Sequence, residues 1–598
     1  MAPEADVNPG DLGDLPRWNL DDLYPGIDSA DLETAFVNLL TDCATFETRY
    51  KGNLTGLTGA ELGQAIAEYE ACEEVMGRIA SFAGLTYVTH MGDASIAQFY
   101  QGVQERLTDI STQLLFFTLE INRLEDDALH TAMADPALAH YAPWVDNVRL
   151  YRDHQLSDEA EQLLHDKSVT GRAAWNRLFD ETIAGLRFEV DGEALTEEQC
   201  LALLSDPDGA TRKKAALALG AVFKQNLPLF SLITNTLAKD KEIEDRWRKF
   251  DSPAASRHLD NQIEPEVAEA LISAVQDSYA DLSHRYYKLK ASWFGQDSIP
   301  FWDRNAPLPN EDDSKRTWSD AQDTVIEAYG AFSPDMADIG QRFFDLGWID
   351  AGVRPGKQGG AFSHSTVPSV HPYILTNYQG RTRDVMTLAH ELGHGVHQVL
   401  AAPQGALMSS TPLTLAETAS VFGEMLTFQA LLAQETDPQK RKFMIAGKVE
   451  DMINTVVRQI AFHCFETRVH IERRSGELTP DRLSEIWMDV QRESLGPGIE
   501  LSPDYENFWV YIPHFIHSPF YVYAYAFGDC LVNSLYAVYQ DSPDGFVEKY
   551  FDLLRAGGTK RHKELLAPFG LDASDPEFWK RGLSMISGFI DELESLEN

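Results

Sequence analysis

Apolar residues recur at helical spacing along most of the chain. One stripe comprises Leu62, Ile66, Tyr69, Val75, Met76, Ile79 and Phe82, and a second comprises Phe99, Val103, Leu107, Ile110, Leu114, Phe117, Ile121 and Leu124. Residues three and four apart share one face of an α-helix, so each stripe predicts a helix that buries that face. Helical spacing resumes at Asp208 and continues to about Lys290. Short strands are indicated at residues 188–193, which contain an Asp-Gly turn, and at residues 373–378. The pattern therefore predicts a mainly α fold.

The strongest chemical signal is a His-Glu-x-x-His motif that lies within one predicted helix. Its apolar stripe comprises Val385, Leu388, Ala389, Leu392, Val396 and Val399. His390 and His394 are one helical turn apart on one face, so both imidazoles can reach one metal ion. Glu391 lies about 100° further round the helix, where a general base acting on water should sit. The motif predicts a zinc site, and its helical setting disfavours the alternative of a chance match.

Two glycines in this helix suggest that something approaches it closely. Gly393 and Gly395 each cost about 1 kcal/mol in a helix interior relative to alanine. An ordinary core helix would not favour them. A helix that needs another backbone or a substrate nearby would.

A second predicted helix offers the third metal ligand. A catalytic zinc ion takes three protein ligands and leaves one position open. Glu417 and Glu424 are seven residues apart and share a helix face. One carboxylate can bind the metal while the other supports a ligand imidazole. Small neighbours favour close packing of this helix against the first; they are Ala416, Ala419, Ser420 and Gly423.

A glycine-rich segment at residues 352–362 precedes the metal motif. It is not a phosphate-binding loop, because Gln358 stands where serine or threonine is required. We expect its glycines to line a cleft. The strand at residues 373–378 can offer an unpaired edge to an extended peptide, although an ordinary small sheet fits equally well. Candidate substrate-binding residues are therefore Gly359, Gly360 and Tyr378.

Residues 511–525 are dense in aromatic side chains and histidine. Pro519 suits a helix start, which would place Tyr521 and Tyr525 on one face. Phenol and imidazole groups can donate hydrogen bonds to an oxyanion. On sequence alone an aromatic core helix is the favoured alternative.

Composition narrows the classes of partner. The chain has 598 residues, is 44% hydrophobic and carries a formal net charge of -43. Such acidity argues against nucleic acid or an anionic membrane as a partner. The five cysteines are scattered without a CxxC pair, which indicates free thiols in a reducing compartment. The N-terminus lacks the pattern of a secretion signal, and no uncharged apolar run reaches the ~18 residues of a membrane span. We expect a cytoplasmic, soluble protein, and the oligomeric state stays open.

Five sequence pieces in this order resemble the oligoendopeptidase F family of thimet-oligopeptidase-type zinc metallopeptidases. They are Arg-Trp-Asn-Leu-Asp-Asp-Leu-Tyr-Pro at 17–25, Gly-Lys-Gln-Gly-Gly-Ala-Phe-Ser at 356–363, the motif at 390–397, Glu-Thr-Ala-Ser-Val-Phe-Gly-Glu at 417–424, and Pro-His-Phe at 513–515 with Pro-Phe-Tyr-Val-Tyr-Ala-Tyr-Ala at 519–526. The motif at 390–397 together with the piece at 417–424 is highly specific, whereas the N-terminal piece is weaker. The resemblance covers nearly the whole chain.

The resemblance implies roles for individual residues. His390, His394 and Glu417 would bind one zinc ion per chain, Glu391 would be the catalytic base, and Glu424 would support a ligand. A histidine and tyrosines of the C-terminal segment would hold the tetrahedral intermediate. His514 and His517 compete for the histidine role, and the tyrosine spacing admits Tyr521 or Tyr525. We favour His514 because it lies in the Pro-His-Phe piece.

The resemblance also implies a fold: a two-lobed helical ellipsoid with a deep central channel and a small β-sheet beside the gluzincin-type zinc helix. Residues 1–17, rich in Pro, Gly and Asp, are expected to form a loose tail. We expect a helical lobe at 18–200 and the zinc metallopeptidase domain at 201–598.

These expectations together describe a metalloendopeptidase that cuts short, unfolded oligopeptides at internal bonds, with Glu391 as general base. A C-terminal-trimming zinc carboxypeptidase is an alternative, since related enzymes use the same motif. A non-catalytic, zinc-containing peptide-binding protein is a third reading. Glu391 argues against it, because a structural metal site needs no base.

Overall fold

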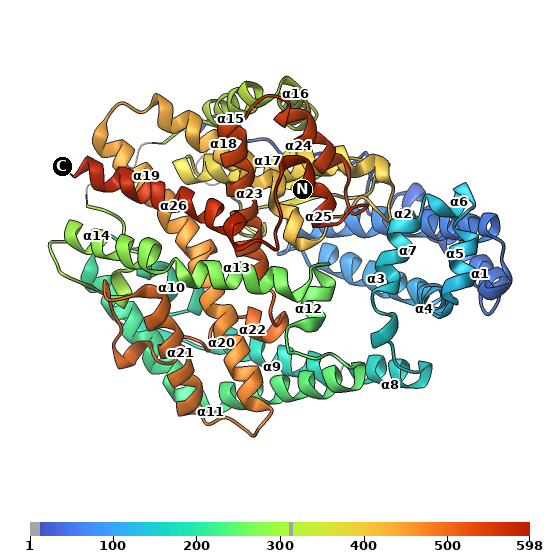
Figure 1. Ribbon diagram of the computed structural model, residues 1–598, viewed down its shortest axis with the longest axis horizontal. Coiled ribbons are helices and arrows are strands. Elements are labelled where there is room, and N and C mark those ends of the chain that lie inside the picture. The colour runs from blue at the N-terminus through green and yellow to red at the C-terminus, as the bar shows by residue number, and fades with distance from the viewer. Residues whose placement is uncertain (1–11, 169, 310–314, 598) are drawn as a thin grey trace. The chain divides into compact units, whose positions relative to one another are not determined.

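The structure is a computed structural model that describes residues 12–168, 170–309 and 315–597. It is 69% helix and 3% strand. Figure 1 shows long helices throughout, with only short strands between them. The prediction of a mainly α fold is confirmed.

Contacts group the chain into two compact units, each built from three segments. The first comprises residues 1–152, 313–434 and 538–570, and the second comprises 153–312, 435–537 and 571–598. The predicted division at residue 200 and the predicted two-lobed ellipsoid with a channel stay predictions. Limited proteolysis would test the division.

The first unit contains the candidate metal centre. Its helices are α1 (Ala30–Tyr50), α2 (Gly59–Val88), α3 (Ala94–Thr112), α4 (Leu115–Arg123), α5 (Asp126–Ala132), α6 (Pro136–Ala139), α7 (Ala142–Arg149), α15 (Trp318–Phe332), α16 (Pro334–Asp345), α17 (Thr382–Ala401), α18 (Leu413–Gln434), α24 (Phe546–Arg555) and α25 (His562–Leu566). Its strands are β4 (Ile349–Asp350), β5 (Phe362–His364) and β6 (Tyr373–Leu375).

The second unit is also helical. Its helices are α8 (Asp158–Ser168), α9 (Arg172–Gly185), α10 (Glu197–Ala202), α11 (Gly209–Arg248), α12 (Ala255–Asp260), α13 (Pro265–Asp277), α14 (Arg285–Trp293), α19 (Pro438–Thr455), α20 (Val457–Arg473), α21 (Pro480–Leu495), α22 (His514–His517) and α26 (Pro576–Leu596). Its strands are β1 (Phe188–Val190), β2 (Glu193–Leu195), β3 (Ile299–Pro300) and β7 (Ile499–Glu500). Helix α23 (Tyr523–Asp541) begins in this unit and ends in the first.

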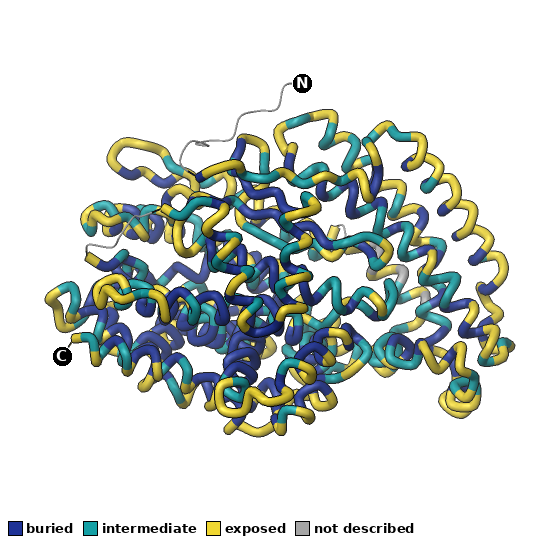
Figure 2. The backbone as a smooth tube through the Cα atoms, turned by 90° about the horizontal axis from the view of Figure 1, so that it is seen from above, coloured by how far each residue is buried: buried dark blue, intermediate teal, exposed yellow. Residues whose placement is uncertain are grey.

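The first predicted stripe forms α2. Thr58 caps the helix in a reciprocal capping box with Glu61, which satisfies free N–H groups of the first turn. Leu62, Ile66 and Ile79 are buried, as the spacing requires. Figure 2 shows the same alternation along many helices, where buried and exposed turns follow each other.

The second predicted stripe is broken. The chain forms α3 and α4 with Gln113 and Leu114 between them, although Leu114 and Phe117 are buried as expected. An apolar stripe reports which side chains are buried, and a break of two residues leaves that spacing nearly unchanged.

The Asp-Gly signal produces the predicted hairpin. β1 and β2 pair antiparallel, and Asp191 and Gly192 connect them with φ values of 53° and 86°. Positive φ at both turn residues is what a two-residue hairpin loop of this kind requires.

A three-stranded sheet lies against α17, in the order β4-β6-β5. β6 pairs parallel with β4 and antiparallel with β5, so both of its edges are occupied. The small sheet beside the metal helix is confirmed. Of the two interpretations of residues 373–378, the ordinary small sheet is the one observed, because β6 is the central strand.

The expected N-terminal tail is only partly described. Residues 1–11 lie outside the described residues. Leu12 is buried, its carbonyl accepts a hydrogen bond from the Trp318 N–H, and the Pro16 carbonyl accepts one from the Ala351 N–H. For residues 12–17 the expectation of a loose tail is wrong, because an apolar side chain and backbone carbonyls find partners in the first unit.

Helix α11 is long and apolar enough to cross a membrane, by length and composition only. It also carries buried polar groups, among them Arg212 and Asn235, and it packs against α9, α20 and α21. Core helices of soluble proteins pass the same test, so this feature is weak evidence for a membrane span.

The closest helix pair in the first unit is α17 and α18. A Cβ atom added to Gly393 would lie 2.4 Å from the Ala419 carbonyl oxygen and 2.7 Å from the Ser420 Cα. A Cβ atom on Gly395 would lie 2.5 Å from the Phe343 ring. The glycines therefore let another backbone and an aromatic ring approach, which confirms the expectation of close packing.

We expect Gly393→Ala to destabilise the protein by about 1–3 kcal/mol, the usual cost of overpacking. Two backbones would have to separate to admit the methyl group. Gly84→Ala in α2 is the matched control, because a Cβ atom there meets nothing within 4 Å. Thermal unfolding should show a lower Tm for the first variant, and an unchanged or higher Tm for the second. Equal Tm values would contradict the packing argument.

Candidate active site

The metal-binding residues predicted from the sequence converge in the first unit. Helix α17 presents His390 and His394, and α18 returns alongside it to present Glu417. The Glu417 Oε2 atom lies 3.3 Å from the His390 Nε2 atom and 3.5 Å from the His394 Nε2 atom. Among the described residues these three form a group whose ligand atoms all lie within 4.8 Å of one another.

This donor set fits a zinc ion. Nitrogen and carboxylate ligands bind zinc at about 2.1 Å, and two such ligands at a tetrahedral angle are about 3.4 Å apart. The two nitrogen–oxygen separations agree with that spacing. Two imidazoles and one carboxylate are also a ligand set of catalytic rather than structural sites.

Charge at the centre is unevenly distributed. Burial favours the neutral form of His390, but hydrogen bonds and charge interactions with Glu417 and Glu424 outweigh it and raise the pKa of His390 to about 10. Burial lowers the pKa of His394 to about 4. Burial opposes ionisation of Glu417, yet the His390 hydrogen bond and both histidine charges lower its pKa to about 2. The carboxylates thus stabilise a positive charge between them, and they would stabilise a bound divalent cation in the same way.

Each ligand side chain has a further partner that fixes its orientation. The His390 Nδ1 atom lies 3.2 Å from the Glu424 Oε2 atom, and His394 donates to the Ala416 carbonyl. The Ser420 hydroxyl donates to the Glu417 Oε2 atom at 2.6 Å. With Nδ1 so engaged, Nε2 of each histidine is free to bind metal.

Glu391 lies beside this group and is 7% exposed. Burial raises its pKa to about 7, opposed by the His390 charge and by a hydrogen bond from the Ser363 backbone N–H. Ser363 belongs to β5, and its hydroxyl donates to the Gln398 side-chain oxygen at 2.9 Å. The edge strand therefore holds Glu391 through its backbone, and α17 holds the strand through Gln398.

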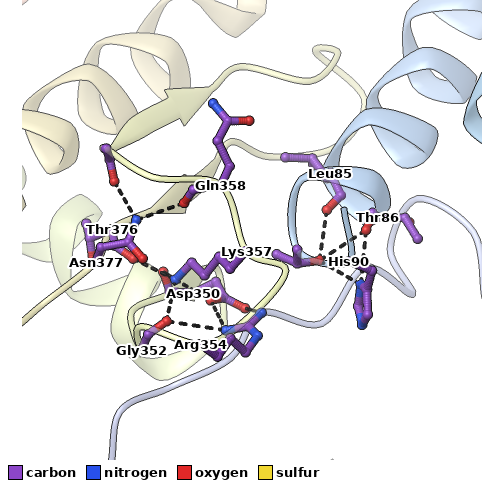
Figure 3. A network of polar contacts seen from close by, with 12 residues as sticks. Leu85, Thr86, His90, Asp350, Gly352, Arg354, Lys357, Gln358, Thr376 and Asn377 are labelled. Carbon is purple, nitrogen blue, oxygen red and sulfur yellow. Dashed lines mark hydrogen bonds and ion pairs between the residues drawn. The ribbon is translucent and has the colours of Figure 1, made fainter. Parts of the chain in front are cut away.

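The glycine segment is anchored by a buried lysine (Figure 3). The Lys357 Nζ atom lies 2.7 Å from an Asp350 carboxylate oxygen and donates to the carbonyls of Gly352 at 2.8 Å and Thr376 at 2.6 Å. Arg354 pairs with both oxygens of Asp350 at 2.6 and 2.7 Å. The Lys357 and Asp350 side chains are 0% and 1% exposed. This network fixes the loop to β4 and β6.

The three candidate substrate-binding residues lie in different surroundings. Gly359 and Gly360 are exposed, and a Cβ atom on either would meet nothing within 4 Å. Asn377 donates to the Gly360 carbonyl at 2.8 Å. Tyr378 is 2% exposed, and its hydroxyl donates to the Arg316 carbonyl at 3.0 Å. A peptide has no access to that ring, so Tyr378 is a core residue here.

The C-terminal candidates belong to the second unit. The His514 Nε2 atom lies 3.3 Å from the Tyr525 hydroxyl, and the Tyr521 and Tyr525 rings are 5.2 Å apart. Burial and the nearby Arg458 charge lower the pKa of His514. His517 instead pairs with Asp180 at 2.8 Å. His514 and the two tyrosines therefore form one cluster, and His517 is not part of it because it contacts Asp180 instead.

The helix start expected at Pro519 is wrong. Helix α23 begins at Tyr523, because Phe520 takes a left-handed conformation with φ of 60°. The Phe520 N–H donates to the Glu466 carboxyl at 2.9 Å, and Glu466 is 1% exposed. This buried hydrogen bond holds a conformation that costs roughly 1–2 kcal/mol in a non-glycine residue.

The sequence analysis did not assign a supporting role to Ser420, Ser363, Lys357 or Glu466. Ser420 lies one helical turn from Glu417 and could have been found by spacing. Ser363 acts through its backbone, Lys357 resembles a surface lysine, and Glu466 is distant in sequence from the turn that it holds.

A helix-borne His-Glu-x-x-His motif, completed by a glutamate of a second helix and flanked by a buried carboxylate, defines a metallopeptidase-type centre on a helical fold. The chain matches Peptidase family M3 over residues 202–585 and Oligopeptidase F over residues 120–188. It belongs to Peptidase family M3, and the resemblance to oligoendopeptidase F is confirmed.

Relatives and a solved structure agree with this assignment. Oligopeptidase PepF of Bacillus subtilis is 26% identical over 97% of this chain and 87% of its own length. An oligoendopeptidase F homologue of Borreliella burgdorferi is 25% identical over 89% of this chain and 91% of its own length. The crystal structure of oligoendopeptidase F from Enterococcus faecium shares the fold, with a TM-score of 0.72 at 22% identity, over 95% of this chain and 98% of that one.

We expect Lys357→Met to destabilise the glycine loop by about 3–5 kcal/mol, because Asp350 and two carbonyls would lose a buried cation. Lys214→Met is the matched control. Its partner is Asp191 at 2.6 Å, and both side chains are more than half exposed, at 52% and 61%. An exposed pair contributes only about 0–1 kcal/mol. Tm and the rate of proteolysis within residues 356–361 should change for the first variant only. If both variants behave like the unmodified protein, the anchoring role is wrong.

Proposed function

We propose that the protein is a zinc-dependent endopeptidase that hydrolyses internal peptide bonds of short, unfolded oligopeptides. The observation that carries the proposal is the convergence of His390, His394 and Glu417, with ligand atoms within 4.8 Å of one another, beside the buried Glu391. Membership of Peptidase family M3 supports a peptidase. The names of the bacterial relatives, an oligopeptidase and an oligoendopeptidase F homologue, support oligopeptides as substrates.

His390, His394 and Glu417 would hold the metal ion, with Glu424 and the Ala416 carbonyl orienting the two imidazoles. A zinc ion bound there supplies Lewis-acid chemistry, which polarises a carbonyl group and lowers the pKa of water towards ~7. The exchangeable proton on His390 would leave when metal binds, because the ligand form of histidine is neutral.

Glu391 is the general base. Its carboxylate accepts a proton from the water that attacks the scissile carbonyl carbon, and then gives that proton to the leaving amine. The Ser363 N–H orients the carboxylate during both transfers. Burial keeps the pKa of Glu391 high enough for it to act as acid in the second transfer.

His514 and Tyr525, with Tyr521 beside them, donate hydrogen bonds to the negative charge that develops on the carbonyl oxygen. This role rests on the resemblance of residues 513–526 to the family. The contact between His514 and Tyr525 supports this choice, and the pairing of His517 with Asp180 argues against the alternative histidine. Exposed Gly359 and Gly360 contact the peptide backbone. We place the protein in the cytoplasm, in keeping with five free cysteines.

Removal of a metal ligand and removal of the general base should affect metal binding and peptide cleavage differently. We expect chelation, and His390→Ala, to abolish both metal content and cleavage. Glu391→Gln should retain the metal, because Glu391 is not a ligand, and lower kcat/KM by about 10²–10⁴. Mass spectrometry of a digested peptide mixture and elemental analysis would measure the two quantities.

The substrate peptides offered to the enzyme should be made in two forms, with a C-terminal amide and with a free C-terminal carboxylate. An endopeptidase tolerates the amide, whereas a carboxypeptidase needs a free carboxylate. Cleavage at full rate after chelation would overturn the proposed mechanism, and cleavage only of free-acid peptides would favour the carboxypeptidase.

His514→Gln should lower kcat by about 10- to 10³-fold with little change in KM, because the lost donor acts chiefly in the transition state. His517→Gln is the matched control from the same short helix, and its kcat should stay within about twofold of the unmodified value. Steady-state kinetics on one peptide would compare them. The reverse ranking would assign the role to His517.

A further inference from the structure

A cavity of about 450 Å³ lies next to the candidate metal centre in the first unit. Its wall includes the metal ligand His394 and, further along α17, His397 and Gln398. Other parts of the wall come from α2, from residues 365–372 and from residues 406–411. A peptide held at the metal centre could therefore place one side chain in this cavity.

Helix α2 contributes one acidic residue, Glu73, to the lining of the cavity. The neighbouring Glu70 and Glu74 are engaged, since they accept hydrogen bonds from the backbone N–H groups of Leu407 and Ser369. Glu73 accepts a hydrogen bond from the Tyr69 hydroxyl, and no cationic side chain among the described residues contributes to the shift of its pKa. Burial raises the pKa of Glu73, which is the mark of a carboxylate short of a cation.

A second acceptor on the same wall is unpaired. His397 is 4% exposed, and it donates one ring N–H to the Ala416 carbonyl. Its Nε2 atom has no hydrogen-bond partner among the described residues. A neutral imidazole that donates from Nδ1 can only accept at Nε2. The residues that carry these two acceptors, one of them anionic, thus line one cavity.

The cations on the wall are already occupied. Arg342 lies over the Trp348 ring, with its guanidinium carbon 5.1 Å from the ring centroid. His371 stacks on the same ring at 3.8 Å and pairs with Asp22 at 3.0 Å. What the cavity lacks is a group that only donates hydrogen bonds and carries positive charge.

We propose that this cavity is a specificity pocket for a lysine or arginine side chain of the peptide substrate, with Glu73 as its ion-pair partner and His397 as a second acceptor. Ammonium and guanidinium groups carry several donors and no acceptor, so they match a carboxylate without a cation and an imidazole nitrogen without a donor. The net charge of -43 adds a long-range attraction for cationic peptides. The inference rests on the proposed function, because it assumes that a peptide occupies the metal centre.

The test uses pairs of peptides with blocked termini that differ at a single position, where one carries lysine and the other the uncharged norleucine. Each position of the peptide is tested in turn with such a pair. For the unmodified enzyme we expect a preference for lysine at one position. Glu73→Gln should lower kcat/KM for that lysine peptide by about 10- to 150-fold, the range for a hydrogen bond to a charged group. Cleavage of the norleucine peptide should stay within about twofold. The control is Glu68→Gln, which changes a partly exposed residue of the same helix that pairs with Arg49 at 2.9 Å, and it should alter neither rate.

A binding measurement separates this inference from the proposed function. In the Glu391→Gln background, titration calorimetry with the same two peptides should show tighter binding of the lysine peptide, and Glu73→Gln should remove the difference. This holds whether or not the protein cleaves them. Equal losses for both peptides would mean that Glu73 is structural, and no lysine preference in either assay would overturn the pocket.

Discussion

The whole centre depends on how closely two helices approach. Gly393 on α17 faces the backbone of Ala419 and Ser420 on α18, at distances that leave no room for a Cβ atom. Glu417 lies directly before that contact, so the short separation brings its carboxylate to the Nε2 atoms of both histidines. Tyr329 extends the same packing, because its hydroxyl donates to the Ala389 carbonyl and its ring fills the space over Gly423. Small residues are thus what allows a side chain as short as glutamate to complete a ligand set from a second helix.

Charge, rather than apolar packing, then decides what this contact can hold. Glu417 and Glu424 approach His390 from both ring nitrogens, which makes His390 cationic, while His394 has the backbone of Ala416 as its other partner and is neutral. His390, His394 and Glu417 therefore have the geometry of a metal site, with two carboxylates gathered around one imidazole. Glu391 differs from the ligands because its hydrogen-bond partner is the neutral Ser363 N–H, although the His390 charge also acts on its pKa.

Local pattern predicted the parts of the fold that are themselves local. Helix α17 follows from its stripe and motif, and Glu417 and Glu424 follow from their spacing on α18. The order of the small sheet could not be predicted, because strands of two or three residues have no periodicity and β6 becomes central only through distant partners. The structural roles of Lys357 and Glu466 could not be predicted for a related reason. Both roles depend on burial, and burial depends on chain segments far away in sequence. The left-handed Phe520 is held by such a distant group, and this is why the helix start was misplaced by four residues, from Pro519 to Tyr523.

The two acceptors of the cavity beside His394, on Glu73 and His397, differ from Lys357 and Glu466 in how far the fold supplies them with partners. Lys357 and Glu466 are buried polar groups whose partners are part of the fold, so their desolvation is offset when the chain folds. Among the described residues, Glu73 is half-buried with only the Tyr69 hydroxyl as a partner, and the Nε2 atom of the buried His397 has none, so part of their desolvation cost is not offset within the protein. The protein would be more stable with apolar residues at these two positions, or with a cationic side chain of its own beside them. A group kept in this state is suited to binding, because a cationic side chain that enters meets acceptors already stripped of water and fixed in place.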